Sequence, residues 1–217
     1  DIKKKFRCIT FKNKQKFNYK NLSALKKLIL ITKPDIIINC IAFTDVNKAE
    51  KKSFKKKCLF LNSKFPEFLS NICYCQNIKL FHFSTDYVFD GKKKGFYSEK
   101  SLPNPINYYG KTKLSGEKKI ILSGCKYYIF RISWLYNMNF KKNFVYKIKK
   151  KILSNKNFLL PVDQFGSTIS SNRVVHYLYE FIKIIKVKNV KSGIYNITTN
   201  KPLSRLGLGR YISKILK

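Results

Sequence analysis

The chain has 217 residues, 44% of them hydrophobic, which suffices for one domain with a buried core or for one domain and part of another. Its net charge of +35 would suit nucleic acid, but only five of its 46 basic residues are arginines and the lysines are spread along the whole chain. The sequence shows no apolar run long enough to cross a bilayer and no signal peptide, so we expect no membrane partner.

Predicted strands and helices alternate along the chain. Apolar residues that recur about every 3.6 positions predict helices, and β-branched runs are typical of strands buried on both faces. In chain order we predict a strand over residues 6–10, a helix over 21–32, a strand over 35–40, a helix over 55–76 that Pro66 interrupts, kinks or begins in part, and a strand over 79–84. We then predict a helix over 107–122, a strand over 127–132, a helix over 143–153, a strand over 158–160, a helix over 171–185, a strand over 193–197 and a helix over 203–216. This alternation indicates an α/β fold, a doubly wound parallel sheet whose ligands bind beyond the carboxyl ends of its strands.

A tyrosine and a lysine four residues apart share one helix face, where the ammonium can lower the phenol pKa from its usual ~10. Such a tyrosine can give a proton to a carbonyl as hydride arrives. Composition alone would produce roughly three such pairs, and three occur: Tyr109/Lys113, Tyr146/Lys150 and Tyr179/Lys183. Only Tyr109 opens a helix soon after a strand that ends in Ser84-Thr85-Asp86. We therefore select Tyr109 and Lys113.

Cysteine and histidine spacing indicates no metal site. The six cysteines lack zinc-ribbon spacing, and without a secretion signal we expect reduced thiols and a cytoplasmic location. His82 and His176 have no His, Cys or acidic neighbour at ligand spacing. We expect structural roles for both histidines and predict no metal.

Several blocks of the sequence together resemble one enzyme family. The blocks are residues 34–39, 42–50, Ser-Thr-Asp-Tyr-Val-Phe-Asp-Gly at 84–91, Pro-Ile-Asn-Tyr-Tyr-Gly-Lys-Thr-Lys-Leu-Ser-Gly-Glu at 105–117, Arg-Ile-Ser-Trp-Leu-Tyr at 131–136 and Asp-Gln-Phe-Gly at 163–166. With these residues the chain resembles extended short-chain dehydrogenase/reductases, and most closely the dTDP-4-dehydrorhamnose reductase family. The order and separation of the blocks suit that family through nearly the whole chain.

The resemblance implies a reduction. NADPH or NADH would deliver hydride to the C4 keto group of dTDP-4-dehydro-L-rhamnose, giving dTDP-L-rhamnose for nucleotide-sugar and cell-surface polysaccharide biosynthesis. Thr85 would hydrogen-bond the carbonyl, Tyr109 would protonate the developing alkoxide, and Lys113 would lower the Tyr109 pKa and hold the nicotinamide ribose. The implied cofactor-binding residues are Asn18, Tyr19, Ala42, Phe43, Thr44, Tyr109 and Lys113. The implied substrate-binding residues are Thr85, Asp86 and Trp134, with a dTDP-sugar as partner and a homodimer left open.

These residues also have structural interpretations, which stay open at this point. Thr85 could cap a strand end, Asp86 could form a turn, and Trp134 could belong to the core. Tyr109 and Lys113 could be an ordinary pair on a helix surface.

The chain departs from the family at both ends and within the sequence. No glycine precedes Gly91, so the Gly-rich turn that holds the cofactor pyrophosphate is absent. We expect residues 1–135 to form an NAD(P)-binding Rossmann-like domain without its first strand and Gly-rich turn. We expect residues 136–217 to form a mixed region with part of the sugar-nucleotide-binding subdomain and returning Rossmann elements. Asn18 stands where the family has an acidic residue, and Asn172 stands where some members carry a metal-associated glutamate.

Three other functions remain open. A non-catalytic relative or a degraded remnant would keep the fold while serving in binding or regulation, although the retention of Thr85, Tyr109 and Lys113 argues against it. Another sugar-nucleotide enzyme, such as an epimerase or dehydratase, is the nearest rival among enzymes. A basic nucleic-acid-binding protein would gather its lysines on one face.

Overall fold

The computed structural model describes residues 6–10, 21–140, 143–154 and 157–216. It divides into two units, the first formed by Asp1–Phe130 with Lys191–Tyr195 and the second by Arg131–Val190 with Asn196–Lys217. The elements that lie in or begin in the first unit are α2 (Leu22–Thr32), β1 (Ile36–Asn39), α3 (Val46–Glu50), α4 (Lys52–Leu59), the π-helix η1 (Phe60–Lys64), α5 (Phe65–Cys75), β2 (Lys79–Thr85), the 3₁₀-helix η2 (Asp86–Val88), α6 (Tyr108–Leu122), β3 (Tyr127–Ile132) and β7 (Gly193–Ile197). The elements of the second unit are β4 (Leu135–Tyr136), α7 (Phe144–Leu153), β5 (Phe165–Gly166), β6 (Ile169–Ser170), α8 (Ser171–Val187), β8 (Leu203–Ser204) and α9 (Arg205–Leu216).

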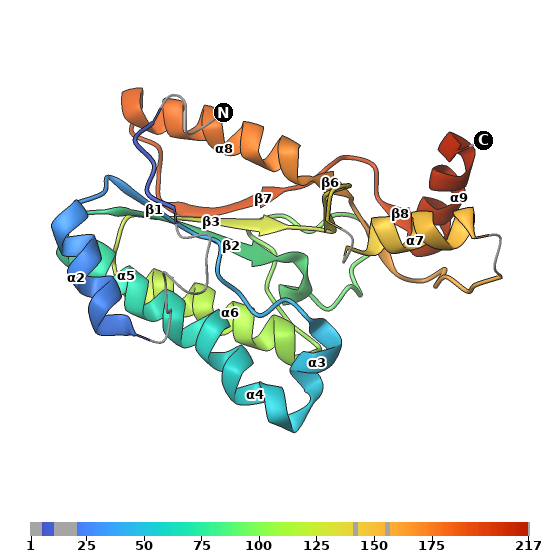
Figure 1. Cartoon of the computed structure of the whole chain (residues 1–217), viewed down its shortest axis with the longest axis horizontal. Helices are drawn as coiled ribbons and strands as arrows, with labels where there is room; N and C mark the ends of the chain where they lie inside the picture. Colours follow the sequence, from blue (N-terminus) through green and yellow to red (C-terminus); the bar gives the residue numbers. More distant parts are fainter. Residues whose placement is uncertain (1–5, 11–20, 141–142, 155–156, 217) are drawn as a thin grey trace. The chain divides into compact units, whose positions relative to one another are not determined.

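A four-stranded sheet with the order β1-β2-β3-β7 forms the centre of the first unit (Figure 1). β1 and β2 are parallel, with Ile36 opposite Lys79 and Asn39 opposite His82, so the two strands end at the same edge of the sheet. α2, α5 and α6 lie along one face of this sheet (Figure 1). The predicted α/β fold with a parallel sheet is confirmed.

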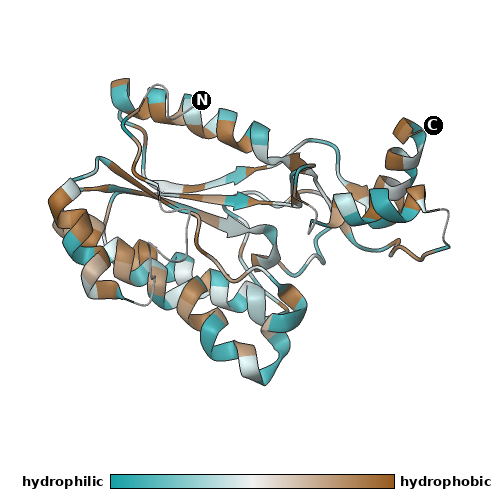
Figure 2. Cartoon of the chain, viewed as in Figure 1, coloured by the Kyte–Doolittle hydropathy of each residue, from teal (hydrophilic) through white to brown (hydrophobic). Residues whose placement is uncertain are grey.

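The main apolar core of the first unit joins this face of the sheet to its helices. Its buried members are Leu25, Ile29, Phe65, Leu69, Ile72, Cys73, Ile78, Leu80, Ile120, Cys125 and Ile129. Figure 2 shows the contrast between α5, which is largely hydrophobic, and α4, which is mostly hydrophilic because it carries four lysines. α5 therefore supplies apolar surface to the core, whereas most of α4 remains in contact with water.

The helix predicted over residues 55–76 consists of three segments, α4, η1 and α5. Pro66 has no N–H to donate to the carbonyl of Asn62, four residues earlier, so a regular α-helical ladder cannot continue there. The N–H of Phe65 donates instead to the carbonyl of Phe60, five residues back, which is the π-helical pattern. This turn carries Asn62 and Ser63 into the interior, where both are fully buried.

Two glycines let α6 approach its neighbours closely. A Cβ on Gly110 would overlap the carbonyl oxygen of Tyr87, and a Cβ on Gly116 would overlap that of Asn62. Larger residues at these positions would push α6 away from η2 and η1. The two glycines therefore set how closely Tyr109 and Lys113 lie to the strand ends.

The second unit is built from short strands and three helices among its described residues. β4 pairs with β6 in parallel, and β5 pairs with β8 antiparallel. Its apolar cluster joins Trp134 to residues of α7 and α9, with Phe158 and Leu160 packed against it. No helix among the described residues of the chain is long and apolar enough to span a membrane.

Two predicted strands are wrong. Residues 6–10 and 158–160 have no regular structure, whereas all six predicted helices correspond to helical segments. Residues 7–10 are exposed and belong to none of the described sheets, and Phe158 and Leu160 pack as irregular chain in the second unit. A short apolar run indicates burial but does not show that a pairing strand exists. Sequence patterns also missed the short helix α3 and the two-residue strands of the second unit.

Candidate functional site

The candidate site of the first unit lies where β1 and β2 end and α6 begins. Thr85 closes β2, and Tyr109 lies in the first turn of α6. Asn107 caps that helix, because its side-chain oxygen accepts a hydrogen bond from the N–H of Gly110 at 2.7 Å. The local sequence Asn-Tyr-Tyr-Gly thus starts a helix at the place where Tyr109 can reach the end of β2.

Thr85, Asp86 and Tyr109 are brought together at this edge. Thr85 and Tyr109 are buried, with 5% and 9% of their surface exposed, and the Thr85 hydroxyl lies close enough to the Tyr109 phenol to influence its pKa. The hydroxyl oxygen of Thr85 also accepts the N–H of Tyr87 at 3.2 Å, which starts η2, and lies 3.1 Å from a carboxylate oxygen of Asp86. The ring of Tyr87 meets that of Tyr109 edge-on, with 5.7 Å between the ring centroids. Two hydroxyl groups therefore lie side by side next to a carboxylate.

The pKa of Tyr109 is raised above its ordinary value, whereas the sequence analysis predicted that Lys113 lowers it. Burial is the main cause of the rise, the hydrogen bond with Thr85 opposes it, and the nearby Asp86 adds to it. Lys113 does not lower this pKa because its amine is directed to other groups. Tyr109 consequently keeps its proton across the neutral pH range, as a proton donor must.

Lys113, on α6, is buried, with only 1% of its surface exposed. Its Nζ donates to the carbonyl oxygen of Phe83 at 2.5 Å and lies 3.2 Å from Nε2 of His82. Burial lowers the pKa of Lys113 to about 8, while the charges of Glu117 and Cys58 act in the opposite direction. Burial, followed by the charge of Lys113, holds the pKa of His82 well below its usual range. The lysine is thus poised to change protonation near neutral pH.

The loop after β1 is held by Asn62. The side chain of Asn62 accepts the N–H of Phe43 at 2.8 Å and donates to the carbonyl of Phe43 at 3.1 Å. The ring of Phe43 is buried in the same apolar cluster as Tyr109. Of the three residues predicted to line a cofactor here, Phe43 therefore packs inward, Ala42 is half-buried and Thr44 is exposed.

The other predicted site residues lie elsewhere. Asn18 and Tyr19 fall outside the described residues. Trp134 belongs to the second unit, where it is buried with a φ of 33° and packs edge-on against Phe144 at 5.2 Å between ring centroids. The guanidinium of Arg205 lies 4.7 Å from the centre of the Trp134 ring. The indole is thus part of the packing of the second unit.

Sequence reasoning missed the polar residues that hold this site. Asn39, His82, Asn62 and Glu117 are all buried, and Glu117 accepts a hydrogen bond from the hydroxyl of Ser84. His82 had been assigned a general structural role. Its signal was its place between Phe81 and Phe83 in the middle of a predicted buried strand, since a buried polar side chain requires partners.

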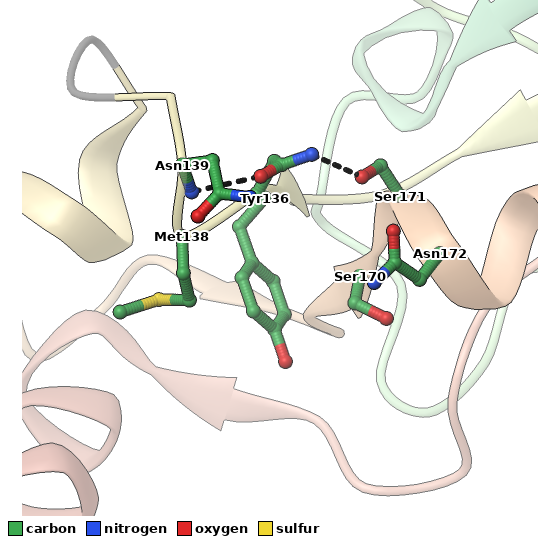
Figure 3. A pocket seen from close by; sticks show the side chains of 7 residues that line it. Tyr136, Met138, Asn139, Ser170, Ser171 and Asn172 are labelled. Atoms are coloured by element: carbon green, nitrogen blue, oxygen red, sulfur yellow. Dashed lines mark hydrogen bonds between the residues drawn. The ribbon is translucent and has the colours of Figure 1, made fainter.

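A cavity of about 300 Å³ lies in the second unit, at the start of α8 (Figure 3). It is lined by Tyr136, Asn137, Met138, Asn139, Ser170, Ser171 and Asn172. Asn137 donates to the Ser171 hydroxyl at 2.8 Å and accepts the N–H of Asn139 at 2.8 Å. Its lining is mostly amides and hydroxyls, and no group of three His, Cys, Asp or Glu side chains gathers anywhere in the described part of the chain.

Comparisons with known proteins agree with one another. A family model described as the RmlD substrate binding domain matches residues 2–217. The chain is 34% identical over 168 residues to a dTDP-4-dehydrorhamnose reductase of Aggregatibacter actinomycetemcomitans, a match that covers 76% of the chain and 56% of that protein. The chain therefore spans little more than half the length of this curated relative.

Two solved structures are similar over almost the whole chain. The dTDP-4-dehydrorhamnose reductase of Clostridium acetobutylicum has a TM-score of 0.84 and 30% identity, covering 94% of this chain and 70% of that one. The dTDP-4-dehydrorhamnose reductase of Bacillus anthracis, solved in complex with NADP, has a TM-score of 0.84 and 26% identity, covering 94% of this chain and 71% of that one.

Proposed function

Because the chain belongs to the RmlD substrate binding domain family, we propose that it carries the ketone-reducing site of a dTDP-4-dehydrorhamnose reductase. The proposed reaction reduces the C4 keto group of dTDP-4-dehydro-L-rhamnose to give dTDP-L-rhamnose. The observation that carries this proposal is the proximity of the buried hydroxyls of Thr85 and Tyr109 at the carboxyl end of β2, with Lys113 on the same helix as Tyr109. Relatives that share this fold bear the name of that activity.

The donor set at this edge fits a nicotinamide dinucleotide. An amine and a phenol one helical turn apart suit the hydroxyls of a ribose, and the exposed hydroxyl of Thr44 follows β1 at the same edge. We propose that Lys113, Tyr109, Ala42 and Thr44 hold such a cofactor, with either NADPH or NADH in that role. When bound, the reduced nicotinamide supplies the hydride that the carbonyl carbon accepts.

The protein's part of the reaction is proton donation and charge stabilisation. Tyr109 keeps its proton until negative charge develops on the carbonyl oxygen, and it then transfers that proton to the oxygen. Thr85, beside Tyr109, turns its hydroxyl hydrogen from Asp86 to the same oxygen and stabilises the charge that develops there. A proton from solvent restores Tyr109. We also propose that Asp86, beside Thr85, orients the sugar. The role of Trp134 in substrate binding stays a prediction, because its indole is packed in the core of the second unit.

A single substitution tests the proposed proton donor. We expect Tyr109→Phe to lower the rate of 4-keto sugar reduction by about 100-fold or more, because the phenolic proton is gone while the ring remains. The rate is measured as the loss of reduced nicotinamide absorbance, and cofactor affinity is measured separately by fluorescence titration.

Tyr146→Phe is the matched control, since Tyr146 belongs to a pair of the same spacing on α7. We expect it to reduce the sugar at the unaltered rate. Unchanged turnover in Tyr109→Phe would rule out the mechanism. A folded parent chain that binds nicotinamide without reducing the sugar would support the non-catalytic alternative.

A further inference from the structure

A buried polar chain formed by Asn39, His82 and Lys113 connects the end of β1, through β2, to α6. The exposed fractions of the three residues are 4%, 0% and 1%. Nδ2 of Asn39 lies 3.0 Å from Nδ1 of His82, and Nε2 of His82 lies 3.2 Å from Nζ of Lys113. Buried polar groups need hydrogen-bond partners. The positions of the hydrogens in the buried polar chain can therefore be assigned by matching each donor with an acceptor.

At each end the buried polar chain is hydrogen-bonded to a backbone group, which can act only as a donor (N–H) or only as an acceptor (C=O). At one end the N–H of Ile41 donates to Oδ1 of Asn39 at 3.0 Å. At the other end Nζ of Lys113 donates to the carbonyl oxygen of Phe83 at 2.5 Å. A backbone N–H only donates and a carbonyl only accepts, so every hydrogen bond between them is directed the same way.

This direction assigns the protons. Since Oδ1 of Asn39 faces Ile41, its amide hydrogens face Nδ1 of His82, which must accept. A neutral imidazole whose Nδ1 accepts carries its hydrogen on Nε2, and that hydrogen points at Nζ of Lys113. An ammonium has no lone pair with which to accept it, whereas a neutral amine has one.

We propose that His82 is a positioning residue that stabilises the neutral form of the Lys113 amine by donating Nε2–H to it. This role rests on the proposed function, in which Lys113 serves the reductive site. The titratable groups around the amine are Glu117 on α6, Cys58 on α4 and His82 on β2. Burial lowers the pKa of Lys113 to about 8 against the charges of Glu117 and Cys58, in the direction that this arrangement requires.

The arrangement couples the charge of Lys113 to the loop after β1. An ammonium at Lys113 would require Nε2 of His82 to accept and Nδ1 to carry the hydrogen. The amide of Asn39 would then have to turn over, which would place its NH₂ against the N–H of Ile41. Protonation of Lys113 therefore weakens the hydrogen bond that holds the first residue of the loop 41–44.

Nitrogen NMR of histidine tests the assignment directly, because the chain contains only two histidines. With ¹⁵N-labelled imidazoles, we expect His82 to be neutral with its hydrogen on Nε2 at pH 10, where Lys113 is a neutral amine. A hydrogen on Nδ1 of His82 at pH 10 would overturn the proposal. His176→Gln assigns the two sets of signals.

Two variants test the effect on the lysine. His82→Gln keeps an N–H where Nε2 was, whereas His82→Asn can still accept from Asn39 but is too short to donate to Lys113. In chains labelled with ¹³C-lysine, we expect the pKa of Lys113 to stay near 8 in His82→Gln and to be higher in His82→Asn, since the neutral amine has lost its donor while burial still lowers the pKa in both variants. Lys113→Met identifies the signal. Equal pKa values in the two variants would contradict the proposal.

These measurements need no substrate, so they separate the inference from the proposed function. If His82 shows the expected tautomer and the chain fails to reduce the sugar, the proposed function fails and the neutral amine stands. If the chain reduces the sugar while Nδ1 of His82 carries the hydrogen at pH 10, the inference fails and the function stands.

Discussion

One face of β2 passes from apolar core to polar site within five residues. Leu80, near its start, packs in the main apolar cluster together with Ile120 of α6. His82 and Ser84, at the next two positions on the same face, meet Lys113 and Glu117 of the same helix. Two buried regions between one strand and one helix thus have opposite chemistry.

The comparison separates what stabilises the fold from what serves its chemistry. Burial of Leu80 lowers the free energy of the folded state without any directional requirement. Burial of His82, Lys113 and Glu117 is tolerated only because each has a partner. The polar region lies at the carboxyl ends of the strands, where α/β sheets bind ligands. The polar groups that are costly to bury therefore lie at the edge of the sheet where such folds bind ligands.

The largest expected effect on stability comes from the apolar region. Leu80→Ala removes a fully buried side chain and leaves a cavity, so we expect the free energy of unfolding to fall by about 2–5 kcal/mol. Urea denaturation followed by circular dichroism measures it. Leu102→Ala, at a residue that is 89% exposed, is the control and should change it by less than about 0.5 kcal/mol. Similar losses in the two variants would remove the distinction between the regions.

The polar region should affect how the free energy of unfolding changes with pH more than it affects the free energy of unfolding at neutral pH. The pKa of Lys113 is about 8 in the folded chain and about 10.4 when unfolded, so between these values the unfolded state binds more protons. The contribution of Lys113 to stability should therefore rise with pH through this window, by roughly 3 kcal/mol. Below pH 8 both states are protonated and the contribution is constant.

Subtracting a variant isolates this contribution. Tyr109 and Cys73 have raised pKa values and make stability fall over an overlapping alkaline range. The quantity to measure is therefore the difference between the parent chain and Lys113→Met, from urea denaturation at several pH values from 7 to 10. A difference that does not change with pH would show that Lys113 is an ordinary ammonium and that the polar region is not distinct.

The smallest expected effect tests whether the start of α6 depends on local structure. Asn107→Ala removes the cap on the N–H of Gly110, and we expect a loss of about 1 kcal/mol in the free energy of unfolding. Asn107→Ser, which can also cap, should restore most of it. If serine were no better than alanine, the start of α6 would be held by its tertiary contacts alone.

Much of the fold was predictable because its signals are local. The helix over 107–122 was predicted from its sequence pattern, and α6 spans Tyr108–Leu122. The β-branched run over 35–40 became β1, and the strand over 79–84 became β2. The strand over 158–160 failed because pairing depends on a distant partner, which a short apolar run does not specify.

The candidate site was predictable only in part. Motif and position selected Thr85 and Tyr109, which the structure places together. The electrostatic prediction for the pair failed, because four-residue spacing puts Lys113 on the same face of α6 as Tyr109 but does not decide where its amine points. The partners of that amine come from β2, about thirty residues earlier.

The sequence by itself determined the alternation of strands and helices and the identity of the proton-donor candidate, since these depend on neighbours within a few residues. Only the tertiary structure decided which buried polar groups meet. Asn39, His82 and Lys113 come from two parallel strands and a helix, and the order of their hydrogen bonds follows from two backbone groups at its ends. That order is a property of three-dimensional contact, because a hydrogen bond has a direction that residue types alone do not reveal.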